Sequence, residues 1–178
     1  MVWKVLTSTL EKFGRFKIVK EQVKLPDDKE ITFSYIDFAK GVCVLPITDD
    51  GHVLCLRQYR HAVNSWQWEI PAGMIDVEDA SPLDTAKREL EEETGYLAQT
   101  WTSLGSFHPS AGSTSEEIFL FAASDLVESK QALESSEQID VHKVSIEELL
   151  DLVAKGEFQH GGGLAAVLRY LVKSGKFR

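Results

Sequence analysis

The chain has 178 residues, of which 43% are hydrophobic, and a formal net charge of −9. This length fits one globular domain with a small appendage. The acidic balance argues against nucleic acid or an anionic membrane surface as a partner, and no apolar run reaches the ~20 residues of a membrane span. The start of the sequence lacks the apolar segment of a signal peptide, and Cys43 and Cys55 fall in apolar, strand-like segments. We therefore expect a cytoplasmic protein with reduced core cysteines, the alternative being a disulfide between neighbouring strands.

The first part of the chain predicts a β-hairpin. Residues from about Phe13 to Leu25 have a strand-like pattern, a turn signal follows at 26–29, and alternation resumes from Ile31 to Phe38. We therefore divide the chain into an N-terminal strand or hairpin segment at residues 1–40 and a main domain at residues 41–178. The hairpin segment is expected to pack on a partner subunit.

The main domain combines strands with helices that come late in the chain. Strand patterns cover residues 41–47, 52–58, 66–70 and 118–123, with a hairpin turn at residues 49–51. Ser145 and Glu148 form a capping box for a helix that ends near Gly156, and an apolar-rich helix runs from Leu164 to Lys173. Mostly antiparallel strands followed by helices predict an α+β domain with a sheet between helices.

A helix from about Pro82 to Thr94 is the strongest local prediction. Ser81 can cap this helix, and Pro82 suits the first helical position. Asp84 lies near the positive end of the helix dipole, where a negative charge is favourable. Gly95 is a typical residue just after a helix end, because glycine adopts the left-handed conformation without penalty.

The helical period concentrates carboxylates on one side of this helix. The apolar stripe consists of Leu83, Ala86 and Leu90. Glu89 and Glu93 are one turn apart beside that stripe, Glu92 lies next to them, and Glu91 falls on the opposite flank. Arg88 and Glu92 form an i,i+4 pair. Three converging carboxylates repel one another unless protons or cations intervene, and hard divalent cations prefer oxygen ligands. The alternative is an ordinary solvated acidic helix face.

The order of these residues resembles the Nudix box, G-x5-E-x7-R-E-U-x-E-E-x-G-U, in which U is a bulky aliphatic residue. The second half matches at Arg88, Glu89, Leu90, Glu92, Glu93 and Gly95, with Tyr96 in place of the final aliphatic residue. Gly73 fits the opening glycine. The middle of the box departs from the pattern, because Asp79 stands where a glutamate is expected and the loop is one residue longer. Glu78 or Asp79 is expected to serve in place of that glutamate.

This resemblance implies the Nudix α/β/α sandwich with a mixed sheet, from Gly41 onwards. It also implies hydrolysis of a nucleoside diphosphate linked to another group, with Mg²⁺ or Mn²⁺. By the same resemblance, Glu89 and Glu93 would be metal ligands, and Glu92 a further ligand or a base. The carbonyl of Ala72 would be a backbone ligand, and Arg88 would orient the glutamates rather than contact substrate.

Residues 56–60 followed by 66–73 look like the ADP-ribose pyrophosphatase branch of the family. Arg60 matches the phosphate-contacting arginine of this branch, and a guanidinium can hold a diphosphate with two parallel hydrogen bonds. Arg57 and Glu69 are expected to contact substrate as well. The alternative for Arg60 is a surface ion pair.

Two loops extend the resemblance to this branch. Residues 107–117 resemble a loop beyond the box in which a proline, here Pro109, marks hydrolases of ADP-ribose and sugar nucleotides, and Glu116 is expected to reach the metals or the terminal sugar. Residues 134–141 resemble the acidic mobile loop that supplies the general base. Glu137 is the better candidate for the base, ahead of Glu134 and Glu92. The alternative for the first loop is an ordinary polar turn, and for Glu137 it is a surface glutamate in a loop.

The sequence therefore predicts a metal-dependent pyrophosphohydrolase of nucleoside diphosphate sugars such as ADP-ribose, GDP-mannose or ADP-glucose. The products would be a nucleoside monophosphate and a sugar phosphate. Members of this branch commonly form homodimers with exchanged N-terminal parts, which suits the hairpin at residues 1–40. The alternatives are a Nudix hydrolase of dinucleoside polyphosphates, nucleoside triphosphates or capped RNA, and a non-catalytic sensor of nucleotide sugars.

Overall fold

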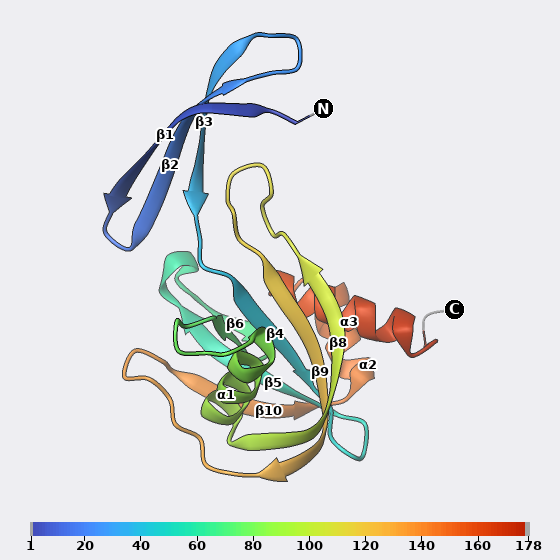
Figure 1. Cartoon of the computed structure of the whole chain (residues 1–178). Coiled ribbons are helices and arrows are strands. Elements are labelled where there is room, and N and C mark those ends of the chain that lie inside the picture. Colours follow the sequence, from blue (N-terminus) through green and yellow to red (C-terminus); the bar gives the residue numbers. More distant parts are fainter. Residues whose placement is uncertain (1, 177–178) are drawn as a thin grey trace. The chain divides into compact units, whose positions relative to one another are not determined.

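A computed structural model describes residues 2–176 of the chain. The chain forms two compact units (Figure 1). The N-terminal unit contains residues 1–40 together with residues 108–117. The main unit contains residues 41–107 and 118–178.

The N-terminal unit is a three-stranded antiparallel sheet in the order β1-β2-β3. The strands are β1 (Lys4–Phe13), β2 (Phe16–Lys24) and β3 (Glu30–Asp37). The predicted hairpin corresponds to β2 and β3, and β1 is an additional strand. All ten residues of β1 are exposed, so this strand lacks the alternation of buried and exposed positions by which a sequence reveals a strand. Residues 108–117 join this unit where Ser113 and Ser115 exchange backbone hydrogen bonds with Ile36.

The main unit contains one mixed sheet and one antiparallel sheet. The mixed sheet has the order β7-β4-β9-β8, formed by β4 (Gly41–Pro46), β7 (Ala72–Met74), β8 (Tyr96–Phe107) and β9 (Ile118–Glu128). In this sheet β4 runs parallel to β9, and its other neighbour β7 is antiparallel. The second sheet has the order β10-β5-β6, formed by β5 (Val53–Arg60), β6 (Ser65–Glu69) and β10 (Ile139–Val144). A short 3-10 helix, η1 (His61–Val63), joins β5 to β6.

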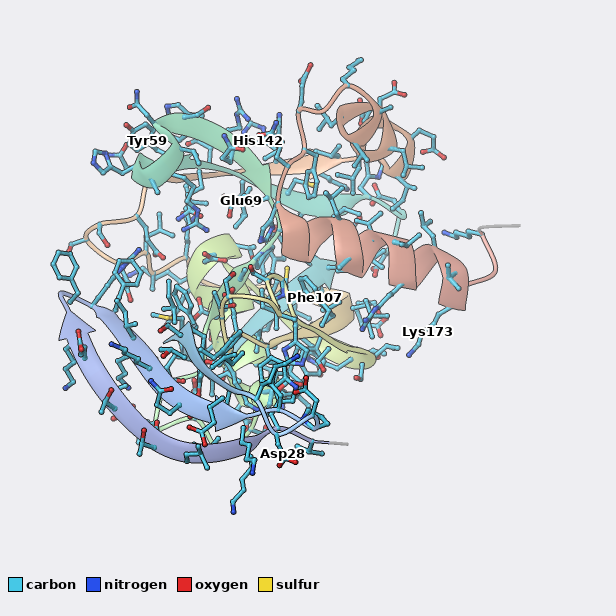
Figure 2. All side chains as sticks on the ribbon, turned by 90° about the horizontal axis from the view of Figure 1, so that it is seen from above. Asp28, Tyr59, Glu69, Phe107, His142 and Lys173 are labelled. Carbon is cyan, nitrogen blue, oxygen red and sulfur yellow. The ribbon has the colours of Figure 1, made fainter. Side chains whose placement is uncertain are left out.

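Capping residues mark the ends of the helices. Helix α1 (Pro82–Thr94) has the predicted bounds: Ser81 accepts a hydrogen bond from the N–H of Asp84, and Gly95 ends the helix with a φ of 74°. Helix α2 (Ile146–Ala154) begins with the predicted capping box. Helix α3 (Gly161–Lys173), whose last residue is labelled in Figure 2, begins earlier than predicted.

Glycines explain the early start of α3. Glycine is a poor helix former, so residues 161–163 give no helical signal. Their small size allows close packing: a Cβ on Gly162 would lie 3.1 Å from Sγ of Cys43, and one on Gly163 would lie 2.6 Å from the ring of Phe158. The helix start therefore presses its backbone against the core, a contact that the local sequence does not reveal.

Strand β4 lies between two layers of helices, as the side chains on its two faces show. Val42 and Val44 pack with Ala86 and Leu90 of α1 in one buried cluster. A second cluster contains Cys43 and Leu45 of β4 and buried side chains of α2 and α3. This arrangement confirms the predicted α/β/α sandwich.

Both cysteines belong to the second of these clusters. Cys43 and Cys55 are buried and free, as predicted. Burial raises the pKa of Cys55 to about 12, so its thiol is unreactive at neutral pH. Within residues 2–176, none of the helices has the length and apolar character needed to cross a membrane.

Candidate active site

Helix α1 presents its acidic residues at the edge of the core. Ala86 and Leu90 are fully buried and fix the rotation of the helix against β4. This rotation carries Glu89 and Glu93 inward, so that their residues are only 8% and 2% exposed. Glu92 remains half-buried. Glu89 and Glu93 therefore lie deeper than the predicted border of core and solvent.

Arg88 holds several of the surrounding acids through its guanidinium group. Its Nη1 donates to Oε1 of Glu89 at 2.9 Å and to Oε2 of Glu92 at 3.0 Å. Its Nη2 donates to the carbonyl of Met74 and to Oδ2 of Asp79, at 3.3 and 3.1 Å. These hydrogen bonds allow Arg88 to orient the carboxylates, and its role in the reaction stays a prediction.

The departure from the box pattern is accommodated by Asp79. Besides Arg88, its Oδ2 accepts hydrogen bonds from Thr85 Oγ1 at 2.9 Å and from the N–H of Asp76 at 3.1 Å. Hydrogen bonds to Arg88 and Thr85 lower the pKa of Asp79, so it stays ionised. Glu78, the other predicted substitute, is exposed. Asp79 is therefore the acid that faces the arginine of the box.

The turn before the loop fits closely around two of the acids. The N–H of Ala72 donates to Oε2 of Glu93 at 2.9 Å. The carboxylate of Glu89 lies against Gly73, where an added Cβ would be 2.0 Å from Oε1. The glycine therefore leaves the space that this carboxylate occupies, and any side chain at this position would displace it. Ala72, the predicted backbone ligand, lies next to both acids.

Burial changes the ionisation of both inward-facing acids. Burial raises the pKa of Glu89 to about 7, against the opposing effect of Arg88. Burial also raises the pKa of Glu93 well above its ordinary value, and the charges of Glu89 and Glu137 add to this effect. These two carboxylates are costly to ionise without a cation beside them.

The donor set suits a hard divalent cation such as Mg²⁺. It consists of buried carboxylate oxygens with raised pKa values beside a glycine that leaves room for them. Among residues 2–176, however, no three His, Cys, Asp or Glu side chains are already grouped as a metal-binding cluster. Arg88 engages one oxygen each of Glu89 and Glu92, which leaves the second oxygen of each carboxylate for a cation.

These pKa shifts predict a pH-dependent effect of metal. Unfolded glutamates ionise near pH 4.5, whereas folded Glu89 holds its proton to about pH 7. As pH rises between these values the metal-free protein loses stability, because the folded state binds more protons than the unfolded state. Metal binding requires the deprotonated carboxylate. Mg²⁺ should therefore raise the melting temperature, relative to a sample with chelator, more at pH 8 than at pH 6. An equal rise at both pH values would contradict Glu89 as a metal ligand.

Arg60 forms the second charged centre of the main unit. Its Nε and Nη2 donate to the two carboxylate oxygens of Glu69 at 2.8 and 2.6 Å (Glu69 is labelled in Figure 2). Glu69 is 5% exposed, and Arg60 remains partly open to solvent. The pKa of Arg60 is raised first by these hydrogen bonds and further by the charges of Glu93 and Glu137. The arginine is thus electrically coupled to the acids of the site.

Replacing Arg60 by methionine should destabilise the protein because the buried Glu69 would lose its partner. We expect the free energy of unfolding to fall by about 2–3 kcal/mol, which is below the range of about 3–5 kcal/mol for fully buried pairs because Arg60 is partly exposed. Denaturant titration measures this change. Adding Glu69→Leu should recover most of the loss. Equal stability of the single variant and the wild type would show that the pair is solvated.

The structure separates the two predicted arginines. Residues three apart on a strand point to opposite faces, so Arg57 and Arg60 leave β5 on different sides. Arg57 stacks over the ring of Trp68, with its Cζ 5.2 Å from the ring centroid. Trp68 in turn contacts His142 edge-on at 5.0 Å. Arg57 therefore belongs to an aromatic cluster on the face away from Arg60.

The acidic loop lies within electrostatic reach of the site. The charge of Glu137 contributes to the raised pKa values of Glu89 and Glu93. Its Oε2 accepts a hydrogen bond from the N–H of Glu134 at 2.9 Å, which closes a tight turn. Glu134 is exposed and presents its N–H rather than its carboxylate to this turn. The placement is compatible with Glu137 as the base.

Pro109 and Glu116 belong to the N-terminal unit. The backbone carbonyl of Glu116 lies 2.8 Å from Nδ1 of His108, which closes the loop between them. Burial raises the pKa of Glu116. Their contacts with substrate remain predictions.

Two polar residues near Arg60 were missed by the sequence analysis. His160, at the start of α3, accepts a hydrogen bond at Nδ1 from the N–H of Ile70 at 3.3 Å, and burial lowers its pKa so that the ring is neutral. Gln58 is 4% exposed, and its Oε1 has no hydrogen-bond partner among the described residues. Gln58 lies within residues 56–60, which resemble the ADP-ribose pyrophosphatase branch. Its burial depends on the pairing of β5 with β6 and β10, which the local sequence does not reveal.

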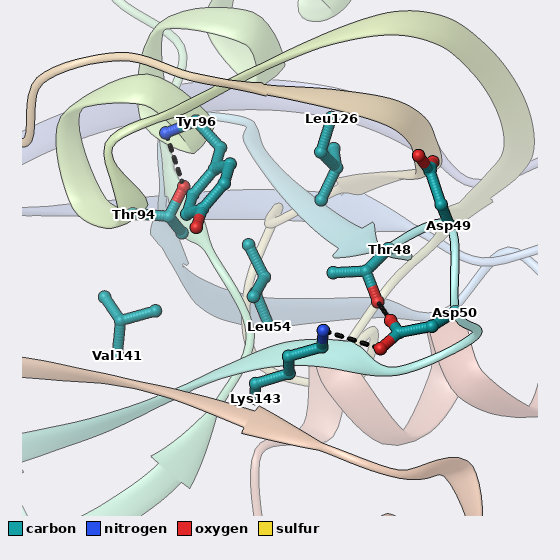
Figure 3. A pocket seen from close by; sticks show the side chains of 9 residues that line it. All are labelled: Thr48, Asp49, Asp50, Leu54, Thr94, Tyr96, Leu126, Val141 and Lys143. Atoms are coloured by element: carbon teal, nitrogen blue, oxygen red, sulfur yellow. Dashed lines mark hydrogen bonds and ion pairs between the residues drawn. The ribbon is translucent and has the colours of Figure 1, made fainter.

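Two cavities indent the main unit. One, of about 300 Å³, is lined by Arg60, Val63, Gln67, Glu69, Gln159, His160 and Gly161. The other, of about 510 Å³, is lined by Thr48, Asp49, Asp50, Leu54, Thr94, Tyr96, Leu126, Val141 and Lys143 (Figure 3). In the larger cavity Lys143 is paired with Asp50 at 2.7 Å. Of these two cavities, the smaller one contains predicted site residues, Arg60 and Glu69.

Comparisons with known proteins agree with this geometry. The NUDIX domain family matches residues 37–166. An ADP-ribose pyrophosphatase of Bacillus subtilis (strain 168) is 35% identical over 153 residues, which cover 85% of this chain and 82% of that protein. An ADP-ribose pyrophosphatase of Mycobacterium tuberculosis is 30% identical over 166 residues, 92% of this chain and 80% of that protein.

A solved structure supports the fold. The crystal structure of an ADP compounds hydrolase aligns with a TM-score of 0.86 at 20% identity, and the alignment covers 99% of this chain and 97% of that one. At this identity the likeness concerns the fold. Together with the box on α1 and the sequence relatives, it shows that the chain belongs to the NUDIX domain family of pyrophosphohydrolase enzymes, in the branch of the ADP-ribose pyrophosphatases.

Proposed function

We propose that the protein hydrolyses the pyrophosphate bond of nucleoside diphosphate sugars, with ADP-ribose as the first candidate, in the presence of Mg²⁺ or Mn²⁺. The observation that carries this proposal is the pair of buried carboxylates, Glu89 and Glu93, held beside Ala72 and Gly73. Such a pair is costly to ionise unless a cation binds to it. The names of the sequence relatives favour ADP-ribose as substrate.

The proposed reaction is attack of water on one phosphorus of the diphosphate. The P–O bond of the bridging oxygen breaks, giving a nucleoside monophosphate and a sugar phosphate. Bound at Glu89, Glu92, Glu93 and the Ala72 carbonyl, divalent cations would supply charge neutralisation for the phosphate oxygens. Arg88 orients Glu89 and Glu92 through its hydrogen bonds.

Other polar residues of the chain would activate the attacking water and bind the substrate. Glu137 takes the proton of the attacking water, since it is the loop acid whose charge acts on both Glu89 and Glu93. Arg60 holds the diphosphate after partial release from Glu69, because its guanidinium is partly open to solvent. Glu69 fixes the orientation of that guanidinium. Pro109 and Glu116 recognise the sugar in this proposal.

The proposal extends to assembly and location. Several apolar side chains of the N-terminal sheet are exposed, among them Trp3, Val5, Leu10 and Phe13. Exposed apolar surface of this kind supports a homodimer that covers it. The two buried, free cysteines support a cytoplasmic location. The net charge of −9 argues against nucleic-acid partners and supports a small-molecule substrate.

Phosphate released through a coupled phosphatase measures the proposed activity. The substrates are ADP-ribose, GDP-mannose, ADP-glucose, dinucleoside polyphosphates and nucleoside triphosphates, each with Mg²⁺ and with chelator. We expect metal-dependent turnover of the sugar nucleotides. Turnover restricted to triphosphates or dinucleotides would move the protein to another Nudix substrate class. Tight binding of a sugar nucleotide without turnover would indicate a sensor.

A further inference from the structure

A short segment at residues 129–132 covers the C-terminal end of α1. It follows directly after β9, and its backbone donates to the end of the helix: the N–H of Ser129 to the carbonyl of Gly95 at 2.7 Å, and the N–H of Ala132 to that of Glu92 at 2.9 Å. The last carbonyls of a helix have no partner within the helix. The segment therefore supplies partners that this helix end requires.

Gln131 makes the central contact of this segment. Its Nε2 donates to the carbonyl of Glu93 at 2.7 Å. The packing is tight as well, because a Cβ on Gly95 would lie 3.0 Å from the backbone nitrogen of Gln131. Gly95 also has a φ of 74°, so both the backbone conformation and the close contact favour glycine there. The side chain of Gln131 is thus fixed on the backbone of a predicted metal ligand.

The loop that carries the candidate base begins at this contact. Residues 133–137 lie between Ala132, bound to α1, and Gln138, whose carbonyl accepts from the N–H of Tyr59 at 3.4 Å. Ile139 then pairs with Gln58 in β5. Both ends of the loop are consequently attached to elements that carry site residues. A loop this short has few ways to place Glu137 once both ends are fixed.

We propose that Gln131 is a positioning residue for hydrolysis: its amide attaches the start of the 133–137 loop to the last turn of α1, and this attachment places Glu137 beside Glu89 and Glu93. The inference rests on the proposed function. A base must come within hydrogen-bond reach of the proton it removes, and a misplacement of 1 Å can cost about 10²-fold in rate. Gln131 does not itself contact the reacting atoms.

The test begins with Gln131→Met, which keeps the length of the side chain and removes the amide donor. We expect kcat for ADP-ribose with Mg²⁺ to fall by about 10- to 100-fold with little change in KM. Gln138→Met is the matched control, because Gln131 and Gln138 are both exposed and it makes the same change at the other end of the loop, where the described contact is made by the backbone carbonyl and not by the side chain. Gln131→Lys restores a donor at a helix C-terminus and should recover part of the loss. Wild-type kcat in Gln131→Met would overturn the inference.

A double-mutant cycle separates positioning from general stability. If Gln131 acts by placing Glu137, then Gln131→Met should cause little further loss in a Glu137→Gln background. If the two losses simply multiply, Gln131 acts independently of Glu137 and the inference is wrong.

Hydrogen–deuterium exchange keeps this inference distinct from the proposed function. Absence of turnover in the wild type would refute the proposed function alone. In that case exchange of the amides of residues 132–137 still reports the attachment. We expect faster exchange in Gln131→Met than in the wild type and in Gln138→Met. Equal exchange in all three proteins would show that Gln131 does not hold the loop.

Discussion

Replacement of Glu93 by glutamine is expected to lower kcat by about three orders of magnitude, which corresponds to about 4 kcal/mol of transition-state stabilisation. The reason is the loss of a negatively charged metal ligand. The hydrogen bond from the N–H of Ala72 is kept, because the amide oxygen of glutamine can still accept it. The same substitution should raise the melting temperature in chelator at pH 8, because it removes a carboxyl that burial makes costly to ionise. The increase in melting temperature that Mg²⁺ causes should be smaller in this variant than in the wild type. Steady-state kinetics and thermal unfolding measure these effects.

Opposite changes in activity and stability distinguish this variant from one that merely unfolds. Glu91→Gln is the matched control, because Glu91 lies on the same helix but binds Ser129 through its carboxylate, and glutamine can keep that hydrogen bond. Its turnover should stay close to that of the wild type. Near-normal turnover of Glu93→Gln would remove Glu93 from the metal site.

Gly73→Ala should reduce kcat by about 100-fold although it adds a single methyl group, a loss comparable to the misplacement of a reacting group by about 1 Å. The new Cβ would overlap the carboxylate of Glu89, which must then turn away from Gly73. The chain can otherwise tolerate alanine, because Gly73 has no left-handed φ. Activity should therefore fall more than stability does.

Magnesium titration of the Gly73→Ala variant tests this explanation. If Glu89 is displaced, the concentration of Mg²⁺ needed for half-maximal activity should rise by about 10- to 100-fold, as for other disturbances around metal ligands. Circular dichroism should show an intact fold. Unchanged kcat and unchanged magnesium dependence would mean that Glu89 does not need its present position.

The best sequence predictions came from residues that act on their immediate neighbours. Ser81, Pro82 and Gly95 fixed the bounds of α1 because capping and the left-handed turn are local effects. The order of acids on this helix indicated the site for the same reason. The continuous apolar run of β4 likewise indicated a buried strand, and all six of its residues are buried.

The failures depended on contacts between distant parts of the chain. Strand β8 was missed because its twelve residues alternate only weakly between buried and exposed positions. The choice between Glu78 and Asp79 required the position of Arg88, and the contact of Gln131 with α1 joins residues 38 positions apart. One further miss did not depend on distant contacts. Arg57 and Arg60 are three residues apart on one strand, so the strand period alone places their side chains on opposite faces.

The set of charges around Arg88 also determines the order in which the site can fill. One guanidinium lies against carboxylates of Asp76, Asp79, Glu89 and Glu92, so negative groups outnumber the positive one. A free diphosphate would approach this surface against electrostatic repulsion. Cations that arrive first, or together with the nucleotide, reverse the sign of the local field. Under the proposed function, the metal-free protein would repel its own substrate, and the supply of divalent cation would control turnover.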